Sequence, residues 1–259
     1  MIKSYAKINL ELKVISKRSD GYHNLYTKMC QITLYDNVRI TSSDIDVLTC
    51  SGFDAPSGED NIAYRALKLY KEKYNIMDCY EIHIEKNIPL GAGLGGGSSN
   101  AACVLRFLND KYRFASRDEL TELALYLGSD VPFFLYNICA LLEGKGDVLT
   151  EIKFYEDKYI LLVRPEGSIS TKEVYTSLRK SDYINSKESN HLEVSAFRID
   201  KSIADLKKEM YCECGNALMS GSGNVVFSFI DDYESAIKIK EKFDNYPWSY
   251  ICRIRREDD

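Results

Sequence analysis

The chain has 259 residues and a net charge of −5; 45% of its residues are apolar and 28% are charged. This length allows one large domain or two smaller ones, and the composition is ordinary for a globular protein. Proteins whose main partner is a nucleic acid usually carry a strong basic excess, so the acidic balance argues against such a partner.

Membrane and metal-binding signals are also missing from the sequence. Charged residues interrupt every apolar run before it reaches the roughly 18 residues of a membrane span. Residues 1–7 contain no long apolar segment of the secretory type, so we expect a cytoplasmic protein without a membrane partner. The eight cysteines include no Cys-x-x-Cys pair, and the three histidines have no metal-spaced partners. We therefore expect mostly buried free thiols and no structural zinc site.

The first half of the chain shows strand periodicity followed by helix signals. Residues 2–15 alternate polar and apolar, which predicts a strand with one buried face, and Asp20-Gly21 predicts the turn that follows it. Asp60 or Asn61 can cap a helix, and Ser116 with Glu119 forms a capping box for another that Gly128 ends. The elements predicted here are strands over 25–41, 80–85, 139–143 and 148–152, and helices over 62–74, 98–109 and 117–127.

The pattern changes between Phe154 and Lys158. We place a domain boundary there, giving an N-terminal domain over 1–155 and a C-terminal domain over 156–259. The second part predicts an apolar strand over 159–163, helices over 172–178 and 202–211, and a strand, helix and strand over 225–230, 233–243 and 250–255. The mixture of hairpins, helices and this late βαβ unit predicts an α+β protein in two lobes.

The most distinctive segment is a glycine- and serine-rich loop from Pro89 to Ala102. Five glycines within the seven positions 91–97 let the backbone turn tightly and approach a ligand closely. A small-residue helix begins directly afterwards, which a flexible linker would not do. Because the free N–H groups and positive dipole end of that helix face the loop, the segment predicts a phosphate site. Ser98 and Ser99 add hydroxyl groups for phosphate oxygens or Mg²⁺.

Three kinds of phosphate loop are compatible with so many glycines. The nucleotide P-loop requires a lysine before its serine, and none stands before Ser98. The dinucleotide fingerprint is matched formally by Gly91, Gly93 and Gly96, but the second strand that it requires is missing. The third form, with Gly93-Leu94-Gly95 ahead of the serines and Asn100, resembles the loop with which the GHMP kinase superfamily wraps the phosphates of ATP.

Two further segments resemble the same superfamily. Ala6-Lys7-Ile8-Asn9-Leu10 is similar to its first motif, and Leu218 to Phe227 to its third, a small-residue loop before a strand. Within the superfamily, Asp20-Gly21-Tyr22-His23 and Leu127 to Phe134 resemble one family. That family phosphorylates the 2-hydroxyl of 4-diphosphocytidyl-2-C-methyl-D-erythritol with ATP and Mg²⁺, in the non-mevalonate route to isoprenoid precursors.

The resemblance implies a two-lobed fold. Residues 1–155 are expected to form a ribosomal protein S5 domain 2-like lobe that binds ATP and carries the catalytic residues, and residues 156–259 a ferredoxin-like lobe on the substrate side. It also implies roles for individual residues. Asp130 is expected to be the base, and Lys7 to neutralise the attacking oxygen and keep Asp130 ionised. The implied ATP-binding residues are Asn61, Lys86, Pro89, Leu90, Gly91, Ala92, Gly93, Leu94, Gly95, Gly96, Gly97, Ser98 and Ser99. The implied substrate-binding residues are Asn9, Tyr22, His23, Thr171 and Tyr175.

Some alternatives stay open at this level. Asn61 is also explained as a helix cap, and Asp130 as a turn residue beside a proline. Asn190-His191-Leu192-Glu193 departs from the family pattern, which has an aspartate where His191 stands. Another GHMP kinase of the homoserine or mevalonate type, a dinucleotide-dependent oxidoreductase and a non-catalytic nucleotide-binding module are the competing functions. We expect a monomer or a weak homodimer.

Overall fold

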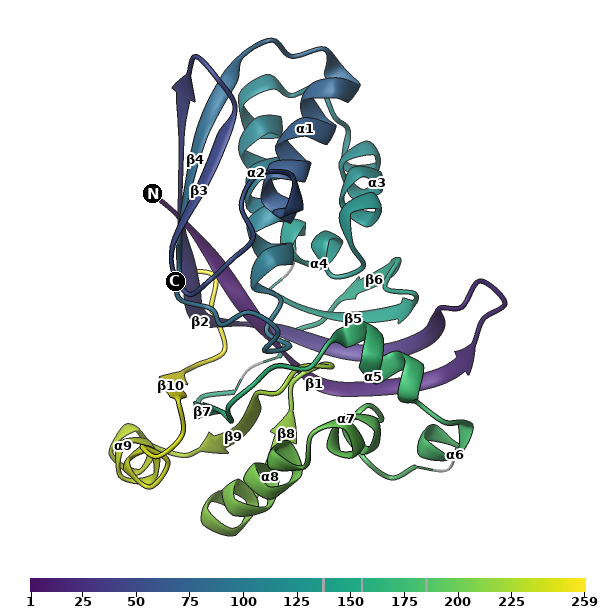
Figure 1. Ribbon diagram of the computed structural model, residues 1–259, viewed down its shortest axis with the longest axis vertical. Coiled ribbons are helices and arrows are strands. Elements are labelled where there is room, and N and C mark those ends of the chain that lie inside the picture. The colour runs from purple at the N-terminus through teal and green to yellow at the C-terminus, as the bar shows by residue number, and fades with distance from the viewer. Residues whose placement is uncertain (137, 155, 185) are drawn as a thin grey trace. The chain divides into compact units, whose positions relative to one another are not determined.

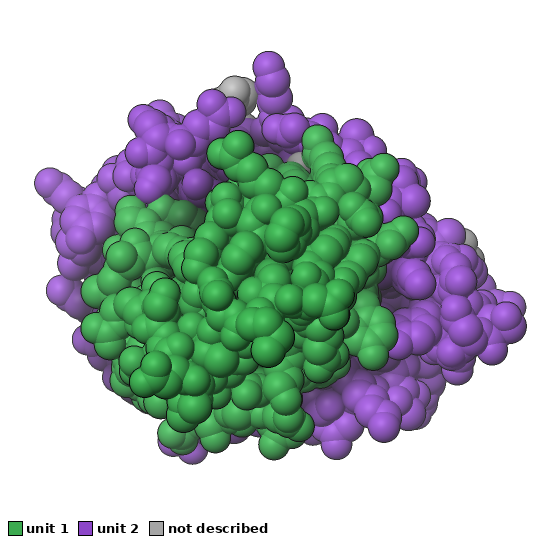
Figure 2. Space-filling view, turned by 90° about the horizontal axis from the view of Figure 1, so that it is seen from above, with its two compact units in different colours: residues 1–6, 34–90, 95–137 green, residues 7–33, 91–94, 138–259 purple. Residues whose placement is uncertain are grey.

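The structure is a computed structural model that describes residues 1–136, 138–154, 156–184 and 186–259. The predicted domain boundary at residue 155 lies outside the described residues. The chain forms two compact units, which Figure 2 shows in green and purple. Unit 1 comprises residues 1–6, 34–90 and 95–137, and unit 2 comprises residues 7–33, 91–94 and 138–259. Among the described helices, none is both long and apolar enough to cross a bilayer.

Unit 1 combines strands with a layer of helices (Figure 1). In it, β4 pairs antiparallel with the second half of β2 and parallel with β3, while α1 packs against α2 and α3, and α4 against α2. The element bounds are β2 (His23–Ser43), β3 (Val47–Gly52), a 3₁₀ turn (Gly58–Asp60), α1 (Ile62–Tyr74), β4 (Cys79–Lys86), α2 (Gly96–Tyr112), α3 (Arg117–Leu127) and α4 (Val131–Tyr136).

The helix signals of the sequence explain these helices. Asn61 caps α1, whose buried residues Ala63, Ala66, Leu67 and Tyr70 recur at helical spacing on one face. Ser116 and Glu119 form the predicted capping box of α3. Helix α2 begins at Gly96, two residues earlier than predicted, because the small glycines that suggested a loop also fit a first helical turn.

Unit 2 contains a hairpin and a second sheet. The hairpin strands β5 and β6 extend from the first half of β2. The second sheet has the order β10-β7-β9-β8 with antiparallel neighbours. The bounds are β5 (Cys139–Gly144), β6 (Val148–Glu151), β7 (Tyr159–Arg164), α5 (Thr171–Ser177), α6 (Lys180–Tyr183), α7 (Glu193–Ile199), α8 (Lys201–Cys214), β8 (Leu218–Met219), β9 (Val226–Ile230), α9 (Tyr233–Glu241) and β10 (Trp248–Cys252).

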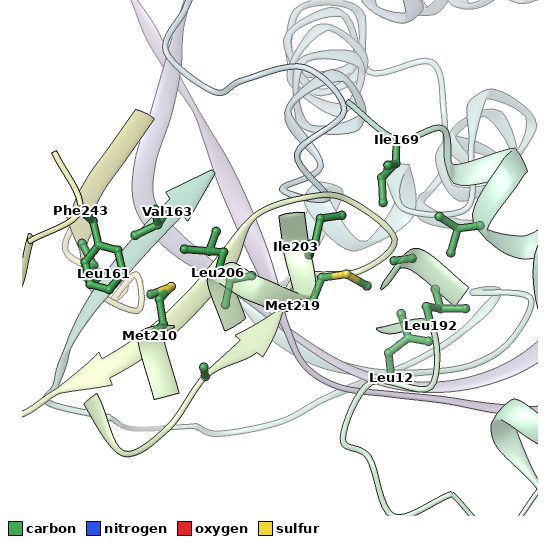
Figure 3. Packing of buried hydrophobic residues seen from close by; sticks show 14 of the residues in the cluster. Leu12, Leu161, Val163, Ile169, Leu192, Ile203, Leu206, Met210, Met219 and Phe243 are labelled. Carbon is green, nitrogen blue, oxygen red and sulfur yellow. The ribbon is translucent and has the colours of Figure 1, made fainter. Parts of the chain in front are cut away.

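This second sheet has the ferredoxin-like arrangement that was predicted. Its four strands take the order fourth, first, third, second, and helices follow the first and third of them. Strand β7 lies between β9 and β10, so the late βαβ unit is a split one. The sheet is held to its helices by a buried apolar cluster (Figure 3). Members of this cluster include Leu12, Leu161, Val163, Leu192, Ile203, Leu206, Met210, Met219 and Phe243.

The structure differs from two predictions, one on the burial of the first strand and one on the state of the cysteines. Strand β1 (Ile2–Lys17) does not bury one face only, since every residue from Ser4 to Asn9 is buried. Its polar side chains there make internal hydrogen bonds, which periodicity alone does not reveal. The cysteines were expected to be mostly buried free thiols, but Cys30 on β2 and Cys139 on β5 stand opposite each other and form a disulfide, and only two of the six described free thiols are buried. Of the free thiols, Cys103 and Cys252 are buried and Cys212 is exposed.

Candidate active site

The predicted site residues fall into two groups, one in each unit. Within the glycine loop, Pro89 and Leu90 belong to unit 1, Gly91 to Leu94 to unit 2, and Gly95 onward to unit 1 again. Pro89, Ala92 and Leu94 are buried, whereas Leu90 and Gly91 are exposed. Each group is described within its own unit.

In unit 2 the loop makes backbone contact with the third motif. A Cβ atom on Gly223 would lie 2.0 Å from the nitrogen of Gly93 and 2.1 Å from the carbonyl carbon of Ala92. A Cβ on Gly93, whose φ is +76°, would lie 2.0 Å from the oxygen of Ser220. The Ser220 hydroxyl donates to the Gly93 oxygen at 3.1 Å. Glycine at positions 93 and 223 is therefore required for the two loops to lie together.

Lys7 is buried beside these loops. Its side chain is 3% exposed, and its Nζ donates to Asn9 Oδ1 at 2.5 Å. Asn9 Nδ2 donates in turn to Thr27 Oγ1 at 2.8 Å, while the Lys7 backbone N–H donates to the Leu94 oxygen at 2.9 Å. This single strand position thus connects the first motif to the glycine loop through the main chain and directs a cationic side chain along Asn9.

In unit 1 the second half of the loop begins helix α2. Its N-cap is Gly95, which has no side chain to satisfy the N–H groups of the first turn. These groups and the positive end of the helix dipole suit a phosphate oxygen. Ser98 is half-buried, whereas Ser99 is 4% exposed and accepts a hydrogen bond from Ser4 Oγ at 2.8 Å. Ser98 is therefore the more accessible of the two predicted phosphate or metal ligands.

A buried network of polar side chains supports the first turn of α2. Lys86 forms an ion pair with Asp36, and its Nζ also donates to Asn100 Oδ1 at 2.9 Å. The other Asp36 oxygen accepts the backbone N–H groups of Asn87 and Ile88 at 2.8 and 2.9 Å. Asn100 Nδ2 donates to Asp36 at 3.0 Å and to Ser4 Oγ at 2.9 Å. Lys86, predicted to lie near the nucleotide, is 4% exposed and held by Asp36.

The other two predicted site residues of unit 1, Asn61 and Asp130, each stand directly before a helix. Asn61 Oδ1 accepts the Ala63 N–H at 2.9 Å, and its Nδ2 donates to the Pro56 oxygen at 2.8 Å, so it serves as a helix cap whatever else it does. Asp130 is half-buried and directly precedes α4, a short buried helix that contains Pro132. The Val131 N–H donates to the Gly128 oxygen at 3.1 Å, which forms the predicted bend around Asp130.

The predicted substrate residues of unit 2 form a partly aromatic group. The rings of His23 and Tyr175 stack with centroids 5.4 Å apart. His23 is 7% exposed, and burial, with the charge of Lys17, lowers its pKa, which favours the neutral imidazole. Tyr22 is 62% exposed and available to a ligand. Thr171 Oγ1 lies 2.8 Å from Ser222 Oγ in the third motif.

No cluster of three metal-ligating His, Cys, Asp or Glu side chains occurs in the part of the chain that the structure describes. A nucleotide-bound Mg²⁺ needs only one or two protein oxygens in addition to phosphates and water, so Ser98 is compatible with such a site.

Sequence reasoning missed the residues that support the site. Asp36 is fully buried, and the signal for it was a carboxylate between Leu34 and Val38 at the alternating positions of one strand face. Asn190 and Glu193 were noticed only as part of a departure from a pattern. Both are at most 2% exposed and hydrogen-bond the third motif.

The fold and these loops define the GHMP kinase class. The family model for the N-terminal domain of GHMP kinases matches residues 61–137, and the model for their C-terminal domain matches residues 173–248. A crystal structure of the mevalonate kinase of Methanococcus jannaschii aligns over 98% of both chains with a TM-score of 0.69 at 15% identity, which shows the shared fold.

Two more similar proteins narrow this class. The 4-diphosphocytidyl-2-C-methyl-D-erythritol kinase of Clostridium botulinum (strain Alaska E43) is 40% identical over 276 aligned residues, covering 97% of this chain and 99% of the relative. A crystal structure of a 4-(cytidine 5'-diphospho)-2C-methyl-D-erythritol kinase is 31% identical over 98% of this chain and 99% of its own, with a TM-score of 0.83. The chain belongs to the 4-diphosphocytidyl-2-C-methyl-D-erythritol kinase family. It is an ATP-dependent kinase, so the oxidoreductase and non-catalytic alternatives are set aside.

Proposed function

We propose that this chain transfers the γ-phosphoryl group of ATP to the 2-hydroxyl of 4-diphosphocytidyl-2-C-methyl-D-erythritol. The observation that carries the proposal is the 40% identity to a kinase of that name over nearly the full length of both chains. Mevalonate and homoserine kinases are the weaker alternatives, because the mevalonate kinase comparison at 15% identity supports the fold alone.

Phosphoryl transfer requires an aligned acceptor, a place for its proton and compensation of phosphate charge. The substrate oxygen bonds to the γ-phosphorus, the bond from that phosphorus to the bridging oxygen of ADP breaks, and the hydroxyl proton passes to the carboxylate of Asp130. Lys7 stabilises the negative charge on the attacking oxygen. Its 3% exposure supports this role, because a cation acts more strongly where water is excluded.

The glycine loop is assigned to the ATP phosphates. Gly91 to Gly93 offer a backbone without large side chains, and the first N–H groups of α2 with the Ser98 hydroxyl offer donors. Mg²⁺, when bound with ATP, neutralises phosphate charge, and Ser98 is the protein oxygen that we assign to it. Asn61 and Lys86 are assigned to the adenosine end of the nucleotide, Asn61 in addition to its cap.

The cytidine diphosphate end of the acceptor is assigned to Tyr22, His23, Thr171 and Tyr175. A neutral His23 offers one donor and one acceptor to the edge of a pyrimidine, and the tyrosine rings offer stacking faces. Asn9 is assigned to the methylerythritol part, since its carboxamide contacts Lys7. We also propose that the protein is cytoplasmic and that it is a monomer or weak homodimer without nucleic-acid or membrane partners. The domain boundary is proposed to lie near residue 155.

A coupled ADP-release assay tests the substrate. We expect turnover with 4-diphosphocytidyl-2-C-methyl-D-erythritol and Mg²⁺–ATP, and none with mevalonate or homoserine; the reverse pattern would refute the proposal. The residue roles have their own test. Asp130→Asn and Lys7→Ala should retain the circular-dichroism spectrum and lose about 10²-fold or more in kcat. A near wild-type rate in either variant removes that residue from its assigned role.

A further inference from the structure

The segment Ser189 to Glu193 links strand β1 to the third motif. The Leu12 N–H donates to the Ser189 oxygen at 2.8 Å, and the His191 N–H donates to the Leu12 oxygen at 2.9 Å, which makes a parallel bridge. The Val14 N–H donates to His191 Nδ1 at 3.1 Å. The imidazole thus takes the place of the next backbone carbonyl, and the segment is fixed on the strand that carries Lys7 and Asn9.

Asn190 reaches from this bridge to the third motif. Its side chain is 2% exposed, and Nδ2 donates to the oxygens of Met219 and Gly221 at 2.9 and 2.8 Å. Its Oδ1 accepts the Leu192 N–H at 2.9 Å. Because both amide hydrogens and the amide oxygen are used, the orientation of this carboxamide is fully determined.

Glu193 binds the third motif through the backbone N–H of Met219, whereas Asn190 binds the backbone oxygen of that residue. Its carboxylate is 1% exposed, accepts the Met219 N–H at 2.9 Å and pairs with Lys207 Nζ at 2.5 Å. Asn190 and Glu193 together therefore bind the N–H and the C=O of Met219. A buried carboxylate is costly unless it is paired, and Lys207 provides the pairing.

These contacts fix the position of Gly221, whose oxygen accepts a hydrogen bond from Asn190 Nδ2. Its φ is +59°, and a Cβ atom there would lie 3.0 Å from Asn9 Oδ1, 3.1 Å from Lys7 Nζ and 3.3 Å from the Gly93 oxygen. The Gly221 backbone therefore packs directly against the end of the Lys7 side chain. A displacement of Gly221 by about 1 Å changes where the ammonium lies, and errors of that size cost on the order of 10²-fold in rate.

We propose that Asn190 and Glu193 are positioning residues for Lys7, acting through Met219 and Gly221. This inference rests on the role proposed above for Lys7 in phosphoryl transfer. It extends that role to two residues that contact neither Lys7 nor the glycine loop in any hydrogen bond described above.

The test compares two asparagines that are bonded alike. Asn216 Nδ2 donates to the oxygens of Cys214 and Phe229 at 3.0 and 2.9 Å, and its Oδ1 accepts the Phe229 N–H at 2.8 Å. Asn190→Asp and Asn216→Asp both place a carboxylate against two carbonyl oxygens. We expect both to lower the urea midpoint, whereas only Asn190→Asp lowers kcat, by about 100-fold, with the KM for ATP within about twofold of wild type.

A second readout does not depend on turnover. In protein labelled with ¹³C-lysine, the Cε resonance of Lys7, assigned with Lys7→Arg, should move in Asn190→Asp and stay in place in Asn216→Asp. Gly221→Ala should move it by a second route. Glu193→Gln keeps an acceptor for Met219 and should leave both kcat and the resonance closer to wild type than Glu193→Ala does.

The outcomes separate the two proposals. An unmoved Lys7 resonance in Asn190→Asp, or an equal loss of kcat in Asn216→Asp, overturns the positioning role. If the wild-type protein fails to phosphorylate the cytidine compound, the proposed function fails, and the Lys7 resonance alone then decides whether Asn190 positions Lys7.

Discussion

The two halves of the glycine loop are fixed in opposite ways. Gly91 to Leu94 lie against the third motif because side chains are missing, since Gly93 and Gly223 bring backbone onto backbone. The start of α2 is fixed by added side chains, through Asp36, Lys86 and Asn100. The first half should therefore be sensitive to any added atom, and the second half to any removed charge or hydrogen bond.

Removal of the Asp36 charge should have the largest effect. Asp36→Asn leaves Lys86 as a buried cation without its counterion and should cost about 3–5 kcal/mol in the free energy of unfolding. The KM for ATP should also rise, because α2 loses its support. Asp46→Asn is the matched control, since Asp46 pairs with Lys71 and accepts the Tyr80 N–H at 2.9 Å but is less buried. Equal effects on the KM for ATP in both variants would contradict the comparison.

An added methyl group where the glycine loop contacts the third motif should have the second largest effect on stability. Gly223→Ala places a Cβ within 2.4 Å of three backbone atoms and should cost about 1–3 kcal/mol by overpacking, with a loss of kcat. Gly215→Ala tests backbone conformation alone, because φ is +72° there and nothing lies within 4 Å of the added atom. Urea unfolding and turnover of the two variants should differ. A Gly223→Ala protein with normal kcat would show that the loop contact is dispensable.

Acidification should weaken the support of the first half of the glycine loop, Gly91 to Leu94, more than that of the second half. The reason is His191, which fixes the Ser189 to Glu193 segment on strand β1. Burial lowers the pKa of His191 below its usual value of 6.5, so the unfolded chain takes up a proton before the folded one. His191 therefore contributes stability above about pH 6.5 that is lost as pH falls through the lowered pKa. Protonation of Nδ1 also removes the acceptor of the Val14 N–H.

Unfolding in urea at pH 7.5 and 5.5 measures this contribution. His23 has a lowered pKa too and acts with the same sign, so the relevant quantity is the difference between wild type and His191→Gln. We expect a smaller acid loss in His191→Gln. Protection against amide exchange, corrected for the intrinsic pH dependence of exchange, should fall at the Lys7 N–H, which donates to the Leu94 oxygen, before it falls at the Ser99 N–H, which donates to the Gly95 oxygen. The opposite order would argue against a link between His191 and the first half of the loop.

The smallest effect is expected away from both halves. Ser116→Ala removes the hydroxyl that accepts the Glu119 N–H and should cost about 1 kcal/mol in the free energy of unfolding. Helix α3 should fray at its start while the KM for ATP and kcat stay unchanged. Thermal unfolding with activity assays checks this, and a changed KM would mean that the α2 support extends further than Asp36 and its partners.

Local signals in the sequence predicted much of the fold. Asn61, Ser116 and Gly128 marked helix ends correctly because capping depends on neighbours in the chain. The ferredoxin-like sheet followed from a resemblance, and the placement of β7 between β9 and β10 came only from the structure. Strand β3 was not predicted, because it is short, ends in Ser51-Gly52 and shows little alternation, and its pairing with β4 comes only from the fold.

The site was predictable where a motif is contiguous and less so where support comes from afar. Lys7 was found, but its burial was not, since periodicity assigned it to a polar face. Asp36 is 64 positions from Asn100, its hydrogen-bond partner, and Cys30 is 109 from Cys139. Pairs of this kind depend on sheet register, which a single sequence does not specify.

The bridge between Leu12 and Asn190 determines which length changes the chain tolerates. Lys187 and Glu188 are exposed, so an inserted residue just before Ser189, whose oxygen accepts the Leu12 N–H, can bulge into solvent. An insertion between Asn190 and Glu193 cannot, because their three-residue spacing lets one side chain reach the C=O of Met219 and the other its N–H. Natural relatives should therefore vary in length before Ser189 and keep a fixed spacing from Ser189 to Glu193.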